Sequence, residues 1–249
     1  MFTFRFGRYL ELTALVSLSV IAWWFLFQSD PATNAAANSG LLMQHMMRPA
    51  EVGQYLVTSF IMWVVMMIAM MTPALIIMVV VFQRVDRSDR RANVFVFASG
   101  YFIAWSVFSG LAAALQWGLH DSGWLGGHAQ GPKPMLAGTA LIAAGIYQLT
   151  PLKESCLKRC RSPVSFFLNY WKPGRSGALR MGLHHGLICL GCCWGLMLTM
   201  FASGTSSVLV MALLSVFILA ERLMPAGPWA ARIPGAVLLG LGIAFVTIG

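Results

Sequence analysis

Seven residues that can bind a soft metal ion gather in one part of the chain. They are Cys156, Cys160, His184, His185, Cys189, Cys192 and Cys193. Thiolate, thioether and imidazole groups suit Cu(I) and similar ions, whereas carboxylate and carbonyl oxygens suit harder ions. We therefore predict a soft-metal site, most simply for Cu(I), with a membrane thiol redox protein that uses Cys189 and Cys192 as the alternative.

The residues after the histidine pair are predicted to share one helical face. At about 100° per residue, that face carries Met181, His185, Cys189, Cys192, Cys193, Met197 and Met200. His184 points to another side of the same helix. The distance from His185 to Met200 is roughly 22 Å at about 1.5 Å per residue, so the stripe predicts a ladder of sites. Cysteine and methionine also fill buried helices, and packing is the competing interpretation.

Cys156 and Cys160 are four residues apart. If the fourth predicted span continues as a helix past Pro151, they share a face and can clamp one ion near His184 and His185. Basic neighbours lower a thiol pKa and favour the metal-binding thiolate, and here they are Lys153, Lys158, Arg159 and Arg161. The orientation of the chain in a membrane explains these charges equally well.

Methionine forms a second group of soft ligands. Met62, Met66 and Met70 are spaced i, i+4, i+8, and Met67 and Met71 repeat the spacing one residue later. The preceding outer loop, 29–52, adds Met43, His45, Met46 and Met47. Leucine or isoleucine would pack with better-defined rotamers, so methionine here indicates a thioether path for a soft ion. Packing again remains the alternative.

The composition indicates that these residues lie on helices that span a membrane. The chain of 249 residues is 58% hydrophobic and 10% charged, against about 25% charged residues in soluble domains. Its apolar blocks approach the roughly 20 residues that cross a bilayer. We predict an all-α, polytopic transmembrane helical bundle, one integral membrane domain over 1–249. Its seven spans are 10–28, 53–82, 94–119, 135–152, 181–201, 206–223 and 233–248, or six if the first is a cleaved signal.

The positive charges predict the orientation. With the N-terminus in the cytoplasm and the C-terminus in the periplasm, all but Arg48 and Lys133 of the 17 lysines and arginines lie on the cytoplasmic side. The loop 153–180 is then a cytoplasmic, basic, cysteine-bearing loop. The net charge of +9 is explained by this topology, so we predict a bacterial inner-membrane protein with the lipid bilayer, and no nucleic acid, as partner. Glycine at 235, 240 and 242 predicts close helix packing.

Several function classes lack their motifs. The chain has no glycine-rich phosphate loop, and no aspartate or glutamate lies in the middle of a predicted span. An ATP-driven pump and a carboxylate proton relay are therefore not expected. No set of residues resembles a catalytic constellation, so an enzyme is not predicted. A monovalent cation entering a cell needs neither an ATP-driven pump nor a proton relay, because the membrane potential favours its inward movement by roughly 2.3 kcal/mol per 100 mV.

Two cysteine-rich stretches resemble a known bacterial family. They are Tyr147-Gln-Leu-Thr-Pro-Leu-Lys-Glu-Ser-Cys-Leu-Lys-Arg-Cys-Arg-Ser-Pro163 and Arg180-Met-Gly-Leu-His-His-Gly-Leu-Ile-Cys-Leu-Gly-Cys-Cys-Trp194. The family consists of uncharacterised, predicted metal-binding integral membrane proteins, and the resemblance extends over about 66–242. It implies that the ligand positions are Cys156, Cys160, His185, Cys189, Cys192 and Cys193.

A looser similarity links the chain to eukaryotic copper transporters, which have outer methionine clusters and a Met-x-x-x-Met motif that Met66 and Met70 fit. This similarity is an analogy, because the number of spans differs. We predict a protein that transfers Cu(I) between the outer Met/His cluster and the inner Cys/His cluster. A further alternative is an assembly factor that delivers metal to a membrane enzyme, with a metal chaperone or metalloenzyme as partner.

Overall fold

The computed structural model describes residues 3–29, 52–86, 90–125, 132–203, 207–223 and 229–248. In this part of the chain all regular structure is α-helical, apart from one isolated bridge between Leu125 and Pro132. The helices are α1 (Thr3–Ser29), α3 (Val52–Val85), α4 (Arg90–Asp121), α5 (Pro134–Gln148), α6 (Pro151–Cys160), α7 (Pro163–Tyr170), α8 (Gly174–Leu198), α9 (Met200–Ser203), α10 (Val208–Leu223) and α11 (Trp229–Ile248). The predicted all-α class is confirmed.

Each predicted span coincides with helical structure, but the helices differ in length. Four of those described, α1, α3, α4 and α8, are long and apolar enough to cross a membrane. The pair α5 and α6 meets the same test only together, with a bend of 67° between its halves. Helix α10 has 16 residues, and α11 counts among the shorter apolar helices. Length and composition therefore support four spans, or five with the bent pair, out of the seven predicted.

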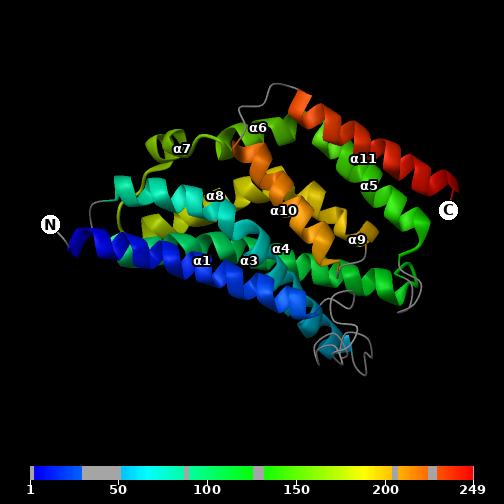
Figure 1. Cartoon of the computed structure of the whole chain (residues 1–249), viewed down its shortest axis with the longest axis horizontal. Helices are drawn as coiled ribbons and strands as arrows, with labels where there is room; N and C mark the ends of the chain where they lie inside the picture. Colours follow the sequence, from blue (N-terminus) through cyan, green and yellow to red (C-terminus); the bar gives the residue numbers. More distant parts are fainter. Residues whose placement is uncertain are drawn as a thin grey trace.

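The long helices lie side by side along the long axis of the molecule (Figure 1). Helix α8 packs against α4, α4 against α3, and α3 against α1, while α11 packs against α5. Helix α1 begins at one end of the molecule and α11 finishes at the other. This arrangement places the cysteine-rich helix α8 inside the bundle.

Glycine permits the close approach of α4 and α8. A Cβ atom on Gly182 would lie 1.9 Å from the carbonyl oxygen of Phe97, and one on Gly100 would lie 2.4 Å from that of Leu179. No side chain fits at these two positions without separating the helices. Small residues of this kind let membrane helices pack backbone against backbone.

The glycines of α11 serve a second interface of the same kind. A Cβ atom on Gly242 would lie 2.8 Å from the carbonyl oxygen of Gly138, and one on Gly145 would lie 2.9 Å from that of Gly235. The predicted packing role is confirmed for Gly235 and Gly242. For Gly240 it is wrong, because a Cβ atom there would meet nothing within 4 Å.

A proline in the middle of α3 creates the docking point of α1. Pro73 lies inside this helix and has no N–H to donate to the carbonyl of Ala69, one turn earlier. That carbonyl instead accepts hydrogen bonds from Ser19 at 3.2 Å and from Trp23 at 3.1 Å, both on α1. The hydrogen-bonding capacity that the proline frees is thus satisfied by the neighbouring helix.

The segment 153–180, predicted as a loop, is largely helical. Pro151 and Pro163 stand at the first turns of α6 and α7, where the missing N–H is not needed. The side chain of Thr150 caps α6 by accepting from the backbone N–H of Lys153. The fourth helix does not continue past Pro151, since α5 has already ended at Gln148. Helix α6 therefore turns across the bundle and brings its cysteines to α8.

Candidate metal centre

Four cysteine side chains meet at the contact between α6 and α8. The Sγ atoms of Cys160 and Cys192 are 3.7 Å apart, and those of Cys192 and Cys193 are 3.3 Å apart. The thiol of Cys192 also donates to the carbonyl of Cys189 at 3.0 Å. All four residues are buried and none forms a disulfide. We call Cys160, Cys189, Cys192 and Cys193 the thiol cluster.

Arg222 of α10 reaches into the thiol cluster. Its Nη2 atom donates to the Sγ atoms of Cys189 at 2.7 Å, Cys192 at 3.5 Å and Cys193 at 3.6 Å. The residue is 8% exposed, and its Nε atom has no hydrogen-bond partner in the part of the chain described. Sequence reasoning counted Arg222 only as a cytoplasmic charge. An arginine at the end of an apolar helix was the signal available for finding it.

Tyr101 of α4 contacts the thiol cluster from another side. Its hydroxyl lies 3.0 Å from the Sγ atom of Cys189 and donates to the carbonyl of Met71 at 3.4 Å. The hydroxyl therefore connects the thiol cluster with the methionine-bearing helix α3. The sequence offered no signal for this residue, since a tyrosine in an apolar helix has no distinctive pattern.

The two adjacent histidines have different surroundings. His185 is 1% exposed and stacks on Tyr101 with ring centroids 5.6 Å apart, and its Nε2 atom has no partner among the described residues. His184 is half-buried and packs edge-on against Tyr170 at 4.4 Å. His185 precedes Cys189 by one helical turn, so its unpaired imidazole belongs to the surroundings of the thiol cluster. His184 does not.

Cys156 and Cys160 are both on α6, but they do not form a site together. Cys160 contacts Cys192, whereas the Sγ atom of Cys156 lies 3.0 Å from the place where a Cβ atom on Gly191 would stand. The expected meeting of this pair with His184 at the surface is not observed. The reason is the 67° bend before α6, which directs the helix towards the middle of α8 rather than its beginning.

The basic residues of α6 pair with other groups. The Nζ atom of Lys153 lies 2.9 Å from both carboxylate oxygens of Glu221 and also donates to Gln148. Arg161 donates from Nε to the carbonyl of Glu221 at 2.7 Å. Lys158 pairs with Glu154 on the surface, and Arg159 is exposed. In the described part of the chain, none of these four basic residues donates a hydrogen bond to a thiol, and their effect on the thiols stays a prediction.

Burial explains this pairing. Lys153 is 1% exposed, and a buried ammonium group without a carboxylate partner is strongly unfavourable. Glu221, also buried, supplies that partner across the α6–α10 contact. The cation that contacts the sulfurs is the next residue along α10, Arg222.

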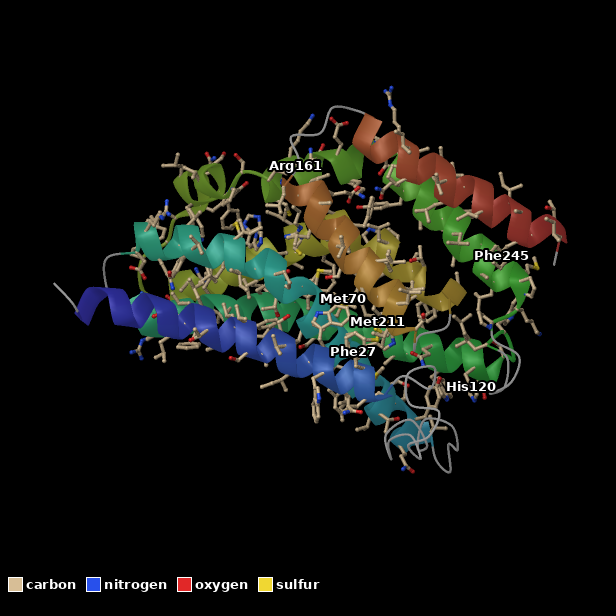
Figure 2. All side chains as sticks on the ribbon, viewed as in Figure 1. Phe27, Met70, His120, Arg161, Met211 and Phe245 are labelled. Atoms are coloured by element: carbon tan, nitrogen blue, oxygen red, sulfur yellow. The ribbon has the colours of Figure 1, made fainter. Side chains whose placement is uncertain are left out.

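The methionines predicted as a path are buried in the same core as the thiol cluster. The core includes Met62, Met66, Met67, Met70, Met71, Met181, Met197, Met200 and Met211. Helix α10 contacts α3 at Met70, whose carbonyl accepts from the hydroxyl of Ser215 at 3.4 Å, and Figure 2 labels Met70 and Met211 on these two helices. The predicted outer ligands Met43, His45, Met46 and Met47 lie outside the described residues.

The donor set of the thiol cluster suits a soft ion. Sulfur donors and an imidazole nitrogen with a free lone pair are the ligands that Cu(I) prefers. Within the described ranges, however, no three histidine, cysteine, aspartate or glutamate side chains are placed so that they would hold a metal ion as they stand. Binding at the thiol cluster therefore requires side chains to move, and the guanidinium of Arg222 is the group that lies among the sulfurs.

Comparison with known proteins gives a family. The PpoB2 family, described as a copper chaperone, matches residues 60–245. The chain belongs to this family. The matched region contains the whole thiol cluster together with Tyr101, His185 and Arg222. The predicted resemblance to a metal-related family is thus confirmed. The metal that the family's description names is copper. No curated protein and no solved structure matches the chain.

Proposed function

We propose that the protein binds Cu(I) as its cargo in the thiol cluster. The observation that carries this proposal is the set of four buried, free cysteines, two of whose Sγ atoms, those of Cys192 and Cys193, are 3.3 Å apart. The unpaired Nε2 atom of His185 adds a fifth soft donor nearby. The copper chaperone description of the family supports the choice of metal.

We place the protein in the bacterial inner membrane, with seven spans, a cytoplasmic N-terminus and a periplasmic C-terminus. Large apolar side chains cover its outer surface, among them Val107, Leu111, Leu213 and Val216, each more than 60% exposed. Such a surface is favourable against lipid and unfavourable in water. The two ends of the chain lie at opposite ends of the molecule (Figure 1), which agrees with an odd number of spans.

We propose further that the buried methionines pass Cu(I) between the outer Met/His loop and the thiol cluster. Met66 and Met70 on α3, and Met197 and Met200 on α8 and α9, belong to one core with the thiols. Thioether groups bind a soft ion more weakly than thiolates do, and a path must release its ion at each step. The membrane potential favours inward movement of a monovalent cation.

The binding proposal is tested by removing the thiols. Replacing Cys189, Cys192 and Cys193 together by serine should abolish tight Cu(I) binding, measured by competition with a Cu(I) chelator under reducing conditions. Cys156→Ser is the matched control, because this thiol lies outside the thiol cluster, and it should bind like the parent. If the triple variant is folded and still binds one Cu(I) tightly, the proposal is wrong.

The path is tested with substitutions that keep apolar volume. Replacing Met66 and Met70 by leucine should leave tight binding intact and slow the movement of Cu(I) across proteoliposomes. Flux equal to that of the parent would show that these methionines only pack.

Two alternatives have observations in their favour. The family description favours delivery to a metalloenzyme, which predicts Cu(I) transfer to an acceptor on one side of the membrane without flux across it. The separation of 3.7 Å between the Sγ atoms of Cys160 and Cys192 favours thiol redox chemistry. Thiol redox chemistry predicts a disulfide when the thiols are alkylated immediately on cell lysis. Cu(I) binding predicts that none of the five cysteines forms a disulfide.

A further inference from the structure

The guanidinium of Arg222 lies where a bound ion would be. Its Nη2 atom is 2.7, 3.5 and 3.6 Å from the Sγ atoms of Cys189, Cys192 and Cys193. A metal ion bound by thiolates lies about 2.3 Å from each sulfur. An ion that the three sulfurs coordinate on the side where Nη2 now lies would overlap with that atom. On that side the guanidinium has to leave before the ion can bind.

We propose that Arg222 is a resident cation of the empty thiol cluster and that the incoming Cu(I) displaces it. This inference rests on the proposed function, since it concerns how the same cluster takes up its cargo. Arginine keeps its positive charge under all conditions that proteins meet, so it can stand in for a monovalent ion. The exchange replaces one positive charge near the sulfurs with another, and each thiol that binds Cu(I) as a thiolate, Cys192 among them, releases its proton to solvent.

The surroundings of Arg222 hold it in place from one side only. The neighbouring residue, Glu221, fixes α10 through Lys153 and Arg161, and thereby sets where the arginine side chain starts. The Nε atom of Arg222 has no partner within the described part of the chain. The sulfurs are therefore the partners that hold the guanidinium, and competition for the sulfurs frees it.

An apolar groove of about 560 Å³ lies between α10 and its neighbours α5, α8, α9 and α11, and α10 contributes Val210, Leu213, Leu214 and Phe217 to its lining. The groove opens to the outer surface, where Leu213 is 61% exposed. No packed helix covers this flank of α10 among the described residues.

Displacement has a consequence for affinity. A group that binds the same sulfurs in the empty state stabilises that state, and it lowers the apparent affinity for the ion accordingly. It also returns to the sulfurs when the ion leaves, which favours release. A protein that has to hand on its cargo benefits from both effects.

The test compares Cu(I) binding by the full-length parent and an Arg222→Leu variant, which removes the charge and introduces no group that binds a soft ion. We expect the dissociation constant to fall at least about tenfold and the dissociation rate to fall with it, measured by chelator competition. Arg159→Leu is the matched control, because it removes an exposed arginine near the thiol cluster that touches no sulfur; its affinity should equal that of the parent.

A second measurement follows the guanidinium in the parent protein itself and uses a conservative variant only for assignment. In the parent protein labelled with ¹⁵N-arginine, the Nε–H resonance of Arg222, assigned by its absence in Arg222→Lys, should shift when one equivalent of Cu(I) is added. Cu(I) is diamagnetic, so the resonance remains observable. An Arg222 resonance that is unchanged at full loading would overturn the inference.

The outcomes separate this inference from the proposed function. Cu(I) binding by the parent, with equal or weaker binding by Arg222→Leu, overturns displacement and leaves the proposed function standing; weaker binding would show that the guanidinium instead neutralises the loaded site. No binding by the parent but binding by Arg222→Leu supports displacement. Absence of binding in both proteins contradicts the proposed function and the inference together.

Discussion

The ion pair between Lys153 and Glu221 joins α6 to α10 at one pair of side chains. Both residues are buried, at 1% and 6% exposure, with the ammonium 2.9 Å from the carboxylate. A buried pair of this kind adds little net stability compared with well-packed apolar residues, but removing one partner is costly. Its role is to fix the position of α10, and with it the arginine that contacts the thiols.

We expect Lys153→Met to lower the free energy of unfolding by about 3–5 kcal/mol, because the carboxylate of Glu221 loses its charged partner. Thermal unfolding in detergent measures the effect. Lys158→Met, which breaks only the exposed pair with Glu154, should cost less than about 1 kcal/mol. Equal effects of the two substitutions would show that the Lys153–Glu221 pair is solvated.

The cysteines should differ in reactivity with a membrane-impermeant thiol reagent added to inside-out vesicles. Cys156 is half-buried, whereas the four residues of the thiol cluster are buried. We expect Cys156 to react first and Cys160 to react at least about tenfold more slowly. Mass spectrometry of tryptic peptides measures the rate at which each cysteine is modified. Similar rates for both residues would mean that α6 opens readily away from α8.

At the scale of elements, the contact between α4 and α8 is determined by glycine. It brings Tyr101 to the thiol cluster, because helices separated by larger side chains would leave the hydroxyl short of Cys189. The contact between α5 and α11 has the same construction, with Gly138 and Gly242. Small residues therefore decide the distances within the bundle, while cysteine and methionine fill the space that results.

Gly182→Ala should destabilise the protein by at least about 2 kcal/mol, because its Cβ atom would lie 1.9 Å from a backbone oxygen that has no room to move. Gly118→Ala on α4 is the control, since a Cβ atom there meets nothing within 4 Å and alanine favours the helix by up to about 1 kcal/mol. The two melting temperatures should change in opposite directions. A neutral Gly182→Ala would mean that α4 and α8 are further apart.

At the scale of the whole molecule, the thiol cluster and the arginine that contacts it lie where three helices meet. Helices α6 and α8 supply its cysteines, α10 supplies the arginine that contacts them, and Figure 1 shows α6 across the bundle from α1. By the positive-inside rule, we expect the basic residues of 153–180 to lie on the cytoplasmic side.

The orientation is tested with reporter fusions. An enzyme that is active only in the periplasm should be active when fused after Gly131 or after Gly249, and inactive after Asp86 or Lys172. The physical basis is the strong bias of lysine and arginine to one side of the predicted spans. Activity after Lys172 would place the cysteines outside the reducing compartment and remove the argument for free thiols.

The sequence by itself determined the all-helical class, the location of the apolar segments and the soft character of the candidate ligands. These features follow from composition and from periodicity along single helices, which neighbouring residues encode directly. The grouping of Cys189, Cys192 and Cys193 on one side of α8 is of this kind. The methionine spacing on α3 is another.

The tertiary structure alone decided which of these residues meet. The bend between α5 and α6 brings Cys160 to Cys192 and leaves Cys156 aside, and no local pattern specifies the direction of a bend. The contacts of Tyr101 and Arg222 with Cys189 join residues 88 and 33 positions apart in the chain. Their charge and hydroxyl group are visible in the sequence, but their partners depend on how separate helices pack, since burial is a property of the whole bundle.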